Sequence, residues 1–393
     1  MDHVLGGPAR GTAANSGSSS TEDFYGFHQA GVATPAQDYL YFATFDVTSD
    51  AADDLRGLLE QWTAATARLT VGQPYEPVAQ TEDKPPVDTG EAVGLSPSRL
   101  TVTIGVGPTL FGSDGADRFG LAHSRPPELV PLLTFQGEDL DPSSSGGDLC
   151  VQACADDPQV AFHAIHVLTR VASSAATLRY TQLGFGRTSS TSRTQETPRN
   201  LMGFKDGTDN ICAEDTQAMN EFVWVQDGDG PAWMAGGSYL IARRIRILFD
   251  VWDATALEDQ QRVIGREKLS GAPLGGESEY DPVDLQATAA NGELEIPADA
   301  HIRLAGPHAN QGQRILRRGY SYSESVEPGS GQIDAGLFFI AFQRSPTRQF
   351  IPIQQRLAAA DALNKHTLHT SSAIFACPPG AQPGGFIGEG LFS

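Results

Sequence analysis

YLYFATFDV, residues 39–47, is rich in aromatic and β-branched side chains, which is typical of a buried β-strand. The residues that follow, at about 50–70, have the apolar spacing of an amphipathic helix. The apolar face of this helix consists of Leu55, Leu58, Leu59, Trp62 and Leu69. A strand that leads directly into an amphipathic helix favours a fold of mixed α and β structure.

The rest of the first half continues this alternation. Two strands are predicted at RLTVTIGV (99–106) and DLCVQACA (148–155). An apolar-faced helix at about 157–173 and a strand at TLRYTQLGF (177–185) follow. The resulting order, β-α-β-β-α-β, is that of a ferredoxin-like unit.

The second half repeats this order of elements, although not the residues themselves. Its predicted strands and helices are GSYLIARRIRILF (237–249), a helix near 253–265, RILRRGYSYS (314–323), GLFFIAF (336–342), a helix from about 346 to 361, and SSAIFAC (371–377). The sequence therefore predicts an α+β fold of two tandem ferredoxin-like (βαββαβ) units that pack together.

Composition divides the chain further. Residues 1–23 are rich in Gly, Ala and Ser and lack periodicity, which predicts a flexible tail. We place one domain at 24–195 and a second at 196–393. The predicted connections at about 71–98, 112–147 and 266–310 are long for a compact fold, and loops of this length are usually functional or mobile.

The overall charge limits the partners of the protein. The 393 residues carry a formal charge of −21, and four of the 27 basic residues are lysines. Such a surface argues against nucleic acid or an anionic membrane as the partner. No segment approaches the roughly 18 apolar residues needed to span a bilayer, so membrane insertion is not expected. The four cysteines are too few for a disulfide scaffold. Cys150 and Cys154 lie four residues apart on one predicted strand, beyond disulfide reach, so we expect them to be buried as small apolar side chains.

The segment GFKDGTDN (203–210) places an acid between two glycines. Most segments of this kind are turns. The alternative is that Gly203 and Gly207 bring the backbone close to a flat cofactor, at whose face Asp206 points.

Three of the nine histidines occur in patterns that merit comparison. His163 and His166 are three residues apart on a predicted helix, but no neighbouring carboxylate or cysteine in the sequence completes a metal site, so a structural role is favoured. His301, in DAHIRLAGPH (299–308), precedes the basic strand at 314–323. An imidazole, several guanidinium groups and an acid in one half of the chain are the groups that a haem peroxidase requires.

Several separate motifs extend this argument. GFKDGT, HIRLAGP, ILRRGYSY and GQIDAGLFFIAFQ occur in the order and spacing of the dye-decolourising peroxidases. YGFHQAGVATPAQ, near the start, is similar to the group that includes the bacterial deferrochelatases. The resemblance runs from about Phe24 to the C-terminal GGFIGEGLFS and covers nearly the whole chain.

The resemblance implies a haem b peroxidase that reduces hydrogen peroxide and oxidises dyes, phenolic or other one-electron donors by way of an oxidised haem. It implies one haem per chain, held mainly by the second unit, with His301 as the axial iron ligand, Asp206 as acid and base, and Arg317 as the stabilising cation. The implied cofactor contacts are Gly203, Phe204, Gly207, Thr208, Asp209, His301, Gly306, Pro307, His308, Arg317, Leu337 and Phe339. Relatives often have Asn-Pro-Arg where this chain has Gly-Pro-His, so His308 takes the place of an arginine near a haem propionate.

Other properties stay open at this point. The same residues would serve a deferrochelatase that releases iron from haem, or a haem carrier or sensor without turnover. A binding module without haem is a further alternative. Members of the group are commonly exported folded by the twin-arginine route, so we expect a secreted or cell-envelope protein, with the cytoplasm as the alternative. The sequence is compatible with a monomer or a homodimer.

Overall fold

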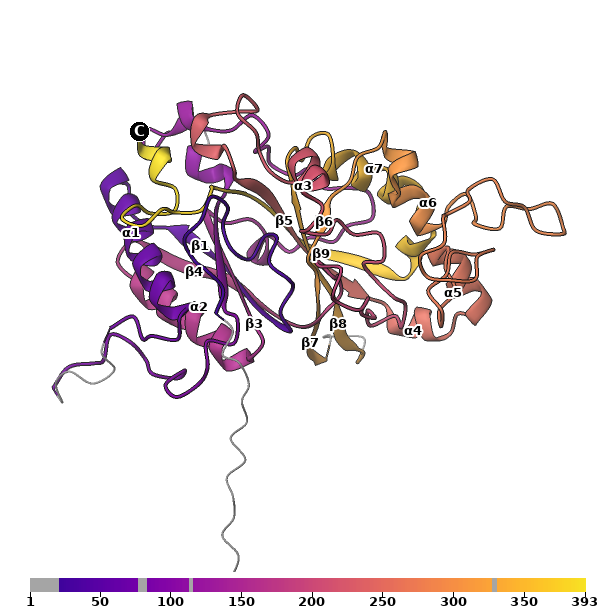
Figure 1. Cartoon of the computed structure of the whole chain (residues 1–393), viewed down its shortest axis with the longest axis horizontal. Helices are drawn as coiled ribbons and strands as arrows, with labels where there is room; N and C mark the ends of the chain where they lie inside the picture. Colours follow the sequence, from indigo (N-terminus) through magenta and orange to yellow (C-terminus); the bar gives the residue numbers. More distant parts are fainter. Residues whose placement is uncertain (1–20, 77–82, 113–115, 327–330) are drawn as a thin grey trace, which may run out of the picture.

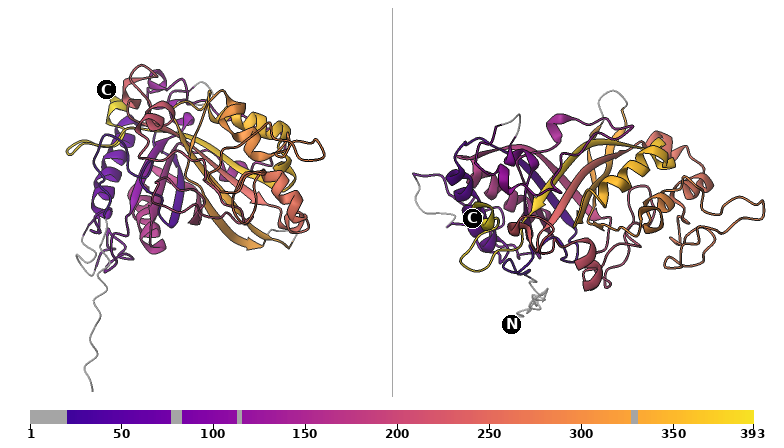
Figure 2. Two further views of the ribbon diagram at one scale, coloured as in Figure 1. Left: turned by 45° about the vertical axis from the view of Figure 1, so that its right-hand side comes forward. Right: turned by 90° about the horizontal axis from the view of Figure 1, so that it is seen from above.

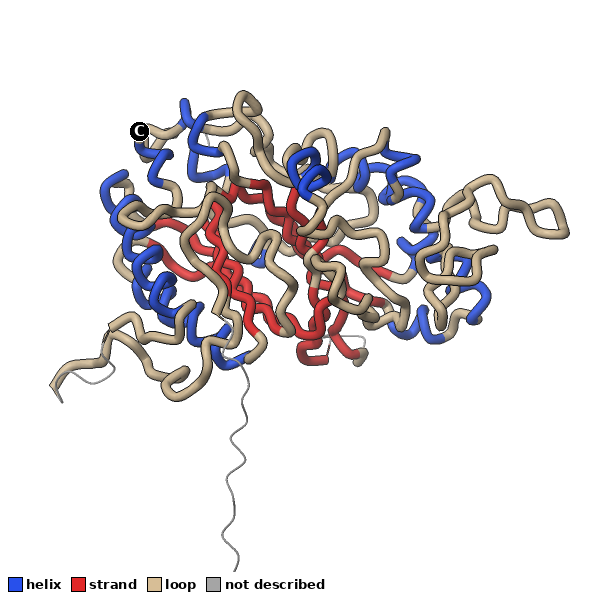
Figure 3. The backbone as a smooth tube through the Cα atoms, viewed as in Figure 1, coloured by secondary structure: helices blue, strands red, loops and turns tan. Residues whose placement is uncertain are grey.

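The computed structural model of the chain describes residues 21–76, 83–112, 116–326 and 331–393, so most of the predicted tail at 1–23 lies outside the described residues. Strands occupy the centre of the molecule and helices lie around them (Figures 1 and 3). No helix within the described ranges is long and apolar enough to cross a membrane.

The elements predicted for the first half are all present, within a few residues of their expected bounds. They are β1 (Tyr39–Val47), α1 (Ala52–Leu69), β2 (Thr101–Val106), β3 (Leu149–Ala155), α2 (Pro158–Ala172) and β4 (Ala176–Arg187). The strands pair antiparallel in the order β4-β1-β3-β2. The five residues predicted for the apolar face of α1 are all buried, and this face packs with α2 against one side of these strands.

The second half departs more from the prediction. Its elements are α3 (Thr216–Phe222), β5 (Ser238–Ile247), α4 (Phe249–Asp253), α5 (Leu257–Ile264), α6 (His301–Ala305), β6 (Leu316–Arg317), β7 (Tyr320–Val326), β8 (Ile333–Gln343), α7 (Phe350–Ala360) and β9 (Thr367–Cys377). Two short helices replace the single helix predicted near 253–265, and α3 and α6 were not predicted. The strand predicted at 314–323 is interrupted at Gly319, where a Cβ atom would lie 2.8 Å from Thr188 Oγ1 and 3.0 Å from Leu337 Cδ1.

The strands of the two halves enclose a common core. Those of the second half pair antiparallel in the order β9-β5-β8-β7, and β6 also pairs with β8. Pairing of β2 with β9 and of β4 with β7 joins the two groups at both edges. Side chains such as Phe42, Phe338 and Phe375 fill the space between the groups. All four cysteines are free thiols, and Cys150 and Cys154 are buried as expected. Cys377 is also buried, and Cys212 is half-buried.

The outer face of the second group of strands is covered differently from that of the first. Alternation along β8 sends Phe338 into the common core and the neighbouring Leu337 and Phe339 to the other side. On that side the helices α6 and α7 stand across a cavity, and they lie at the opposite end of the molecule from α1 and α2 (Figures 1 and 2). A cavity thus occupies much of the position that a helix layer fills in the first half.

The structure also brings a carboxylate to the histidine pair of α2, which the local sequence did not indicate. Glu91, from the connection predicted at 71–98, lies with one oxygen 2.7 Å from Nδ1 of His163 and the other 2.7 Å from Nδ1 of His166. Within the described residues, no group of three or more His, Cys, Asp or Glu side chains could hold a metal ion. Both histidines thus connect the long loop that carries Glu91 to helix α2 through these contacts.

Replacement of Glu91 by glutamine is expected to lower the free energy of unfolding at pH 7 by about 1 kcal/mol, because the acid is partly exposed. Burial alone would raise its pKa, but hydrogen bonds from Thr89, His163 and His166 lower the pKa from 4.5 to about 2. A lowered pKa of an acid stabilises the fold above pH 4.5, and this contribution is lost as the pH falls towards 2.

Urea unfolding of the wild type and Glu91→Gln at pH 7 and pH 3 measures this effect. The difference between the two proteins should be much smaller at pH 3. Glu60→Gln removes an exposed acid that pairs with Arg56 on α1, and it should have little effect at either pH. An equal difference at both pH values would contradict the assigned role of the Glu91 carboxylate.

Candidate active site

A cavity of about 690 Å³ lies between the outer face of β5 and β8 on one side and α6 and α7 on the other. The structure gathers around it twelve of the thirteen residues predicted from the motifs. These are Phe204, Asp206, Gly207, Thr208, Asp209, His301, Gly306, Pro307, His308, Arg317, Leu337 and Phe339. Gly203 is the exception and faces a separate surface hollow beside Lys268.

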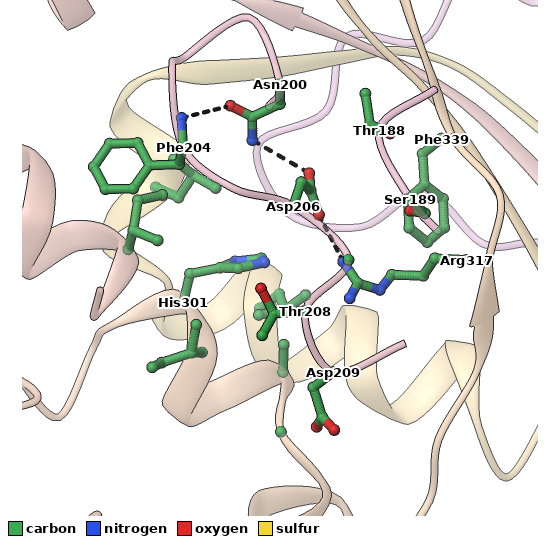
Figure 4. Close-up of a pocket in the computed structure, with 18 of the residues that line it drawn as sticks. Thr188, Ser189, Asn200, Phe204, Asp206, Thr208, Asp209, His301, Arg317 and Phe339 are labelled. Carbon is green, nitrogen blue, oxygen red and sulfur yellow. Dashed lines mark hydrogen bonds and ion pairs between the residues drawn. The ribbon is translucent and has the colours of Figure 1, made fainter. Parts of the chain in front are cut away.

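His301 is the first residue of α6, and its ring points into the cavity (Figure 4). Its Nδ1 lies 2.6 Å from Oδ2 of Asp361, a carboxylate whose side chain is only 3% exposed. The other oxygen of Asp361 accepts a hydrogen bond from the backbone N–H of Leu363 at 2.9 Å. Burial lowers the pKa of His301. The charge and hydrogen bond of Asp361 raise the pKa by more than burial lowers it, so the pKa lies above 6.5. The hydrogen bond to Asp361 holds the imidazole in one orientation, in which Nε2 of the neutral ring can bind a metal.

Asp206 and Arg317 face His301 from the opposite wall (Figure 4). One carboxylate oxygen of Asp206 accepts a hydrogen bond from Arg317 Nη1 at 2.8 Å, and the other accepts one from Asn200 Nδ2 at 3.2 Å. Asn200 is itself fixed, because its side-chain oxygen accepts hydrogen bonds from the backbone N–H groups of Met202 and Phe204. An acid and a cation are therefore set side by side within reach of the cavity.

The two glycines beside Asp206 lie close to neighbouring protein segments, whereas their predicted approach to a flat cofactor stays a prediction. Both have positive φ, +85° for Gly203 and +93° for Gly207. A Cβ atom on Gly207 would lie 2.9 Å from Ser189 Cα, and one on Gly203 would lie 2.8 Å from Lys268 Cε. The close approaches are therefore to neighbouring protein segments, although Gly207 also lines the cavity.

Apolar side chains form much of the remaining wall. Leu337 and Phe339 of β8 line the cavity on the strand side, and Ile353 and Leu357 of α7 contribute from the opposite side. Such walls suit a large planar cofactor, which buries most of its surface in an apolar pocket with a few fixed polar groups.

Polar residues line other parts of the cavity. Thr208 donates a hydrogen bond to Glu279 Oε1 at 3.0 Å. Asp209 is exposed and lies 3.6 Å from Arg314. His308, in the turn after α6, is also exposed. His308 lines the cavity, and the departure from Asn-Pro-Arg leaves its role towards a haem propionate open.

One wall contains a buried ion pair that the sequence did not indicate. Arg243 of β5 pairs with Glu138, which comes from the predicted connection at 112–147, and their side chains are 1% and 2% exposed. The guanidinium lies over the rings of Phe135 and Phe350. Burial lowers the pKa of Arg243 although Glu138 opposes this effect. The first half of the chain thus contributes a charged group beside the cavity of the second half.

An imidazole held by a buried carboxylate, facing an acid and a guanidinium across an apolar cavity, defines the site of a haem peroxidase. Comparisons with known proteins agree with this class. The family model for the N-terminal part of Dyp-type peroxidases matches residues 29–186, and the model for the C-terminal part matches residues 197–382. The chain belongs to the Dyp-type peroxidase family, as the sequence motifs indicated.

Individual relatives support this assignment. The chain is 39% identical to a dye-decolorizing peroxidase of Thermobifida fusca, over 92% of this chain and 83% of the relative. It is 36% identical to a deferrochelatase of Escherichia coli, over 95% of this chain and 88% of the relative. The solved structure of ferric DtpA from Streptomyces lividans, 38% identical, superposes with a TM-score of 0.86 and covers 95% of this chain and 98% of that one. The predicted enzyme class, a peroxidase, and the α+β fold with antiparallel strands are thereby confirmed.

Sequence reasoning missed the residues that hold the predicted groups in place, namely Asp361, Asn200 and Asn210. The position of Asp361 was a weak indication of a special role. It directly follows a helix, and a carboxylate is unfavourable at the negative C-terminal end of the helix dipole. The two asparagines lie within or near GFKDGTDN, where they are indistinguishable from ordinary turn residues.

Proposed function

We propose that this chain is a haem b peroxidase in which Asp206 and Arg317 activate hydrogen peroxide opposite the axial ligand His301. The observation that carries this proposal is the placement of the Asp206–Arg317 pair across one cavity from the His301–Asp361 pair. The residues present suit haem, because one imidazole nitrogen is tied to a carboxylate while the ring points into a mostly apolar space. Haem bound there would supply an iron that takes up peroxide and stores oxidising equivalents for the donor.

The chain's own groups then account for the proton transfers. Asp206, when ionised, accepts a proton from hydrogen peroxide and returns it to the oxygen that leaves as water. Arg317, beside it, stabilises the negative charge that develops on that oxygen. Asp361 accepts the hydrogen bond from His301 Nδ1, which fixes the tautomer and increases electron donation through Nε2.

We also propose that the fold consists of two ferredoxin-like units, in domains at 24–195 and 196–393. The strand orders β4-β1-β3-β2 and β9-β5-β8-β7 support this proposal, since they are equivalent when each half is numbered from its first strand. Helices α1 and α2 cover the first unit closely, whereas the second unit would use the same face to hold its cofactor.

Iron release from haem and haem transport are the alternatives, and the relatives carry both the peroxidase and the deferrochelatase names. The paired acid and guanidinium favour turnover of peroxide, because haem carriage alone requires neither group opposite the iron ligand. Incubation of the holoprotein with peroxide and a phenolic donor, followed by analysis of the porphyrin, tests this choice. Donor oxidation with the haem intact supports the peroxidase, and metal-free porphyrin as the product would overturn it.

Replacement of His301 by alanine is expected to weaken haem binding by at least about 100-fold, since loss of a ligand's hydrogen-bond partner alone costs about 10–100-fold. Asp361→Asn should produce that smaller loss. The measurement is a titration of each apoprotein with haem, followed by the Soret absorbance. His123→Ala changes an exposed histidine outside the cavity, and we expect it to retain the Soret band. Unchanged haem binding in His301→Ala would refute the proposed ligand.

A further inference from the structure

Arg317 lies on a strand that by itself is poorly fixed. β6 has two residues and, in the described part of the chain, pairs only with β8, through Leu316 opposite Phe342 and Arg317 opposite Ala341. The adjoining Arg318 donates its backbone N–H to Ile340 O of β8 at 2.7 Å. Because neighbouring residues of a strand direct their backbone groups to opposite sides, the N–H and C=O of Arg317 point to the free edge. They need partners there.

The side chain of Asn210 supplies both partners. Its Oδ1 accepts a hydrogen bond from the backbone N–H of Arg317 at 2.8 Å, and its Nδ2 donates to the carbonyl of Arg317 at 2.8 Å. The same Nδ2 donates to the carbonyl of Ser190 at 3.0 Å. The amide thus takes the place of a neighbouring strand and uses both of its donor hydrogens. At 7% exposure, Asn210 has little water to replace these bonds.

Asn210 also belongs to the loop that carries Asp206. Its backbone N–H donates to Gly207 O at 3.0 Å, and this hydrogen bond closes a turn from Gly207 to Asn210. The turn rests on the segment at Ser189, where a Cβ atom on Gly207 would come within 2.9 Å of Ser189 Cα. One short loop therefore carries both the carboxylate of Asp206 and, four residues later, the amide of Asn210. That amide binds the backbone of Arg317, the partner of Asp206.

We infer that Asn210 is a positioning residue that sets Arg317 against Asp206 and thereby controls the activation of peroxide. This inference rests on the proposed function of that pair. Asp206 and Arg317 are 111 residues apart in the chain, and their hydrogen bond of 2.8 Å requires both backbones to be fixed. Displacement of a reacting group by about 1 Å can cost about 100-fold in rate, so the amide of Asn210 matters although it touches neither peroxide nor cofactor.

Two variants test the inference in the haem-loaded protein. Asn210→Asp has the same size but cannot donate to Arg317 O or Ser190 O, and Asn210→Ala removes all three bonds. Asn220→Asp, at an exposed position of α3, is the matched control. We expect both Asn210 variants to react with peroxide about 10–100-fold more slowly, whereas the control keeps the wild-type rate.

A second measurement separates positioning from mere loss of stability. Fluoride bound to the ferric protein is an anion that Arg317 would stabilise, so its affinity should fall in the Asn210 variants even at temperatures well below unfolding. Asn210→Ser, whose hydroxyl can replace one bond, should recover part of the affinity. Wild-type peroxide rates and fluoride affinity in the Asn210 variants would overturn the inference. Failure of the wild type itself to react with peroxide would instead refute the proposed function.

Discussion

Asp206→Asn is expected to react with hydrogen peroxide about 10²–10⁴-fold more slowly than the wild type, the range that a positioned acid–base group contributes. The amide matches the carboxylate in size and can still accept the hydrogen bond from Arg317, but it cannot take a proton from peroxide. Stopped-flow mixing of the haem-loaded protein with peroxide, followed at the Soret band, measures the rate. Because His301 and Asp361 are untouched on the opposite wall, the haem content should not change.

Two further variants make this result specific. Asp227→Asn changes an exposed acid outside the cavity, and its peroxide rate should equal that of the wild type. Arg317→Leu should lose about 10²–10³-fold, since the cation acts on developing charge and not on the proton itself. Wild-type peroxide kinetics in both Asp206→Asn and Arg317→Leu would contradict the proposed chemistry.

Local sequence patterns predicted the bounds and the buried face of an element correctly where that element packs along its whole length. β1 has the predicted bounds, and α1 buries the predicted face, because strand alternation and helical spacing are determined by nearby residues. The patterns failed around the cavity. α6 has five residues, too few for an amphipathic period to be visible, and β6 and β7 are separated by close packing at Gly319. These features depend on contacts with distant segments, which a local pattern does not contain.

The site shows the same division. Without the family resemblance, the sequence showed only that His301, several arginines and Asp206 lie in one half of the chain. The family motifs then indicated Arg317, and not Arg314 or Arg318, as the stabilising cation. In the structure Arg317 donates a hydrogen bond to Asp206, whereas Arg318 is buried and donates to Thr34 and Gln37. The residues that hold the site together are common types, and the partners that define their roles lie six positions away for Asn200, 60 for Asp361 and 107 for Asn210.

The buried pair beside the cavity leads to the largest expected effect on stability. Glu138→Gln is expected to lower the free energy of unfolding by about 3–5 kcal/mol, because it leaves the buried guanidinium of Arg243 without its carboxylate. Nε and Nη1 of Arg243 have no hydrogen-bond partner in the described structure. The nearby His369 carries no negative charge that could replace the carboxylate of Glu138. Burial and the charge of Arg243 lower the pKa of His369 to about 3, so this imidazole is neutral at ordinary pH.

Urea unfolding of the haem-loaded wild type, Glu138→Gln and the double variant Glu138→Gln/Arg243→Met measures this effect. The double variant removes the unpaired charge and keeps a side chain of similar length, so it should be more stable than the single variant. That order is the test, since simple damage to packing would make the double variant the less stable of the two. Because Glu138 comes from the first half and Arg243 from the second, a large loss in Glu138→Gln would also mean that the peroxide-binding half depends on the first half for its stability.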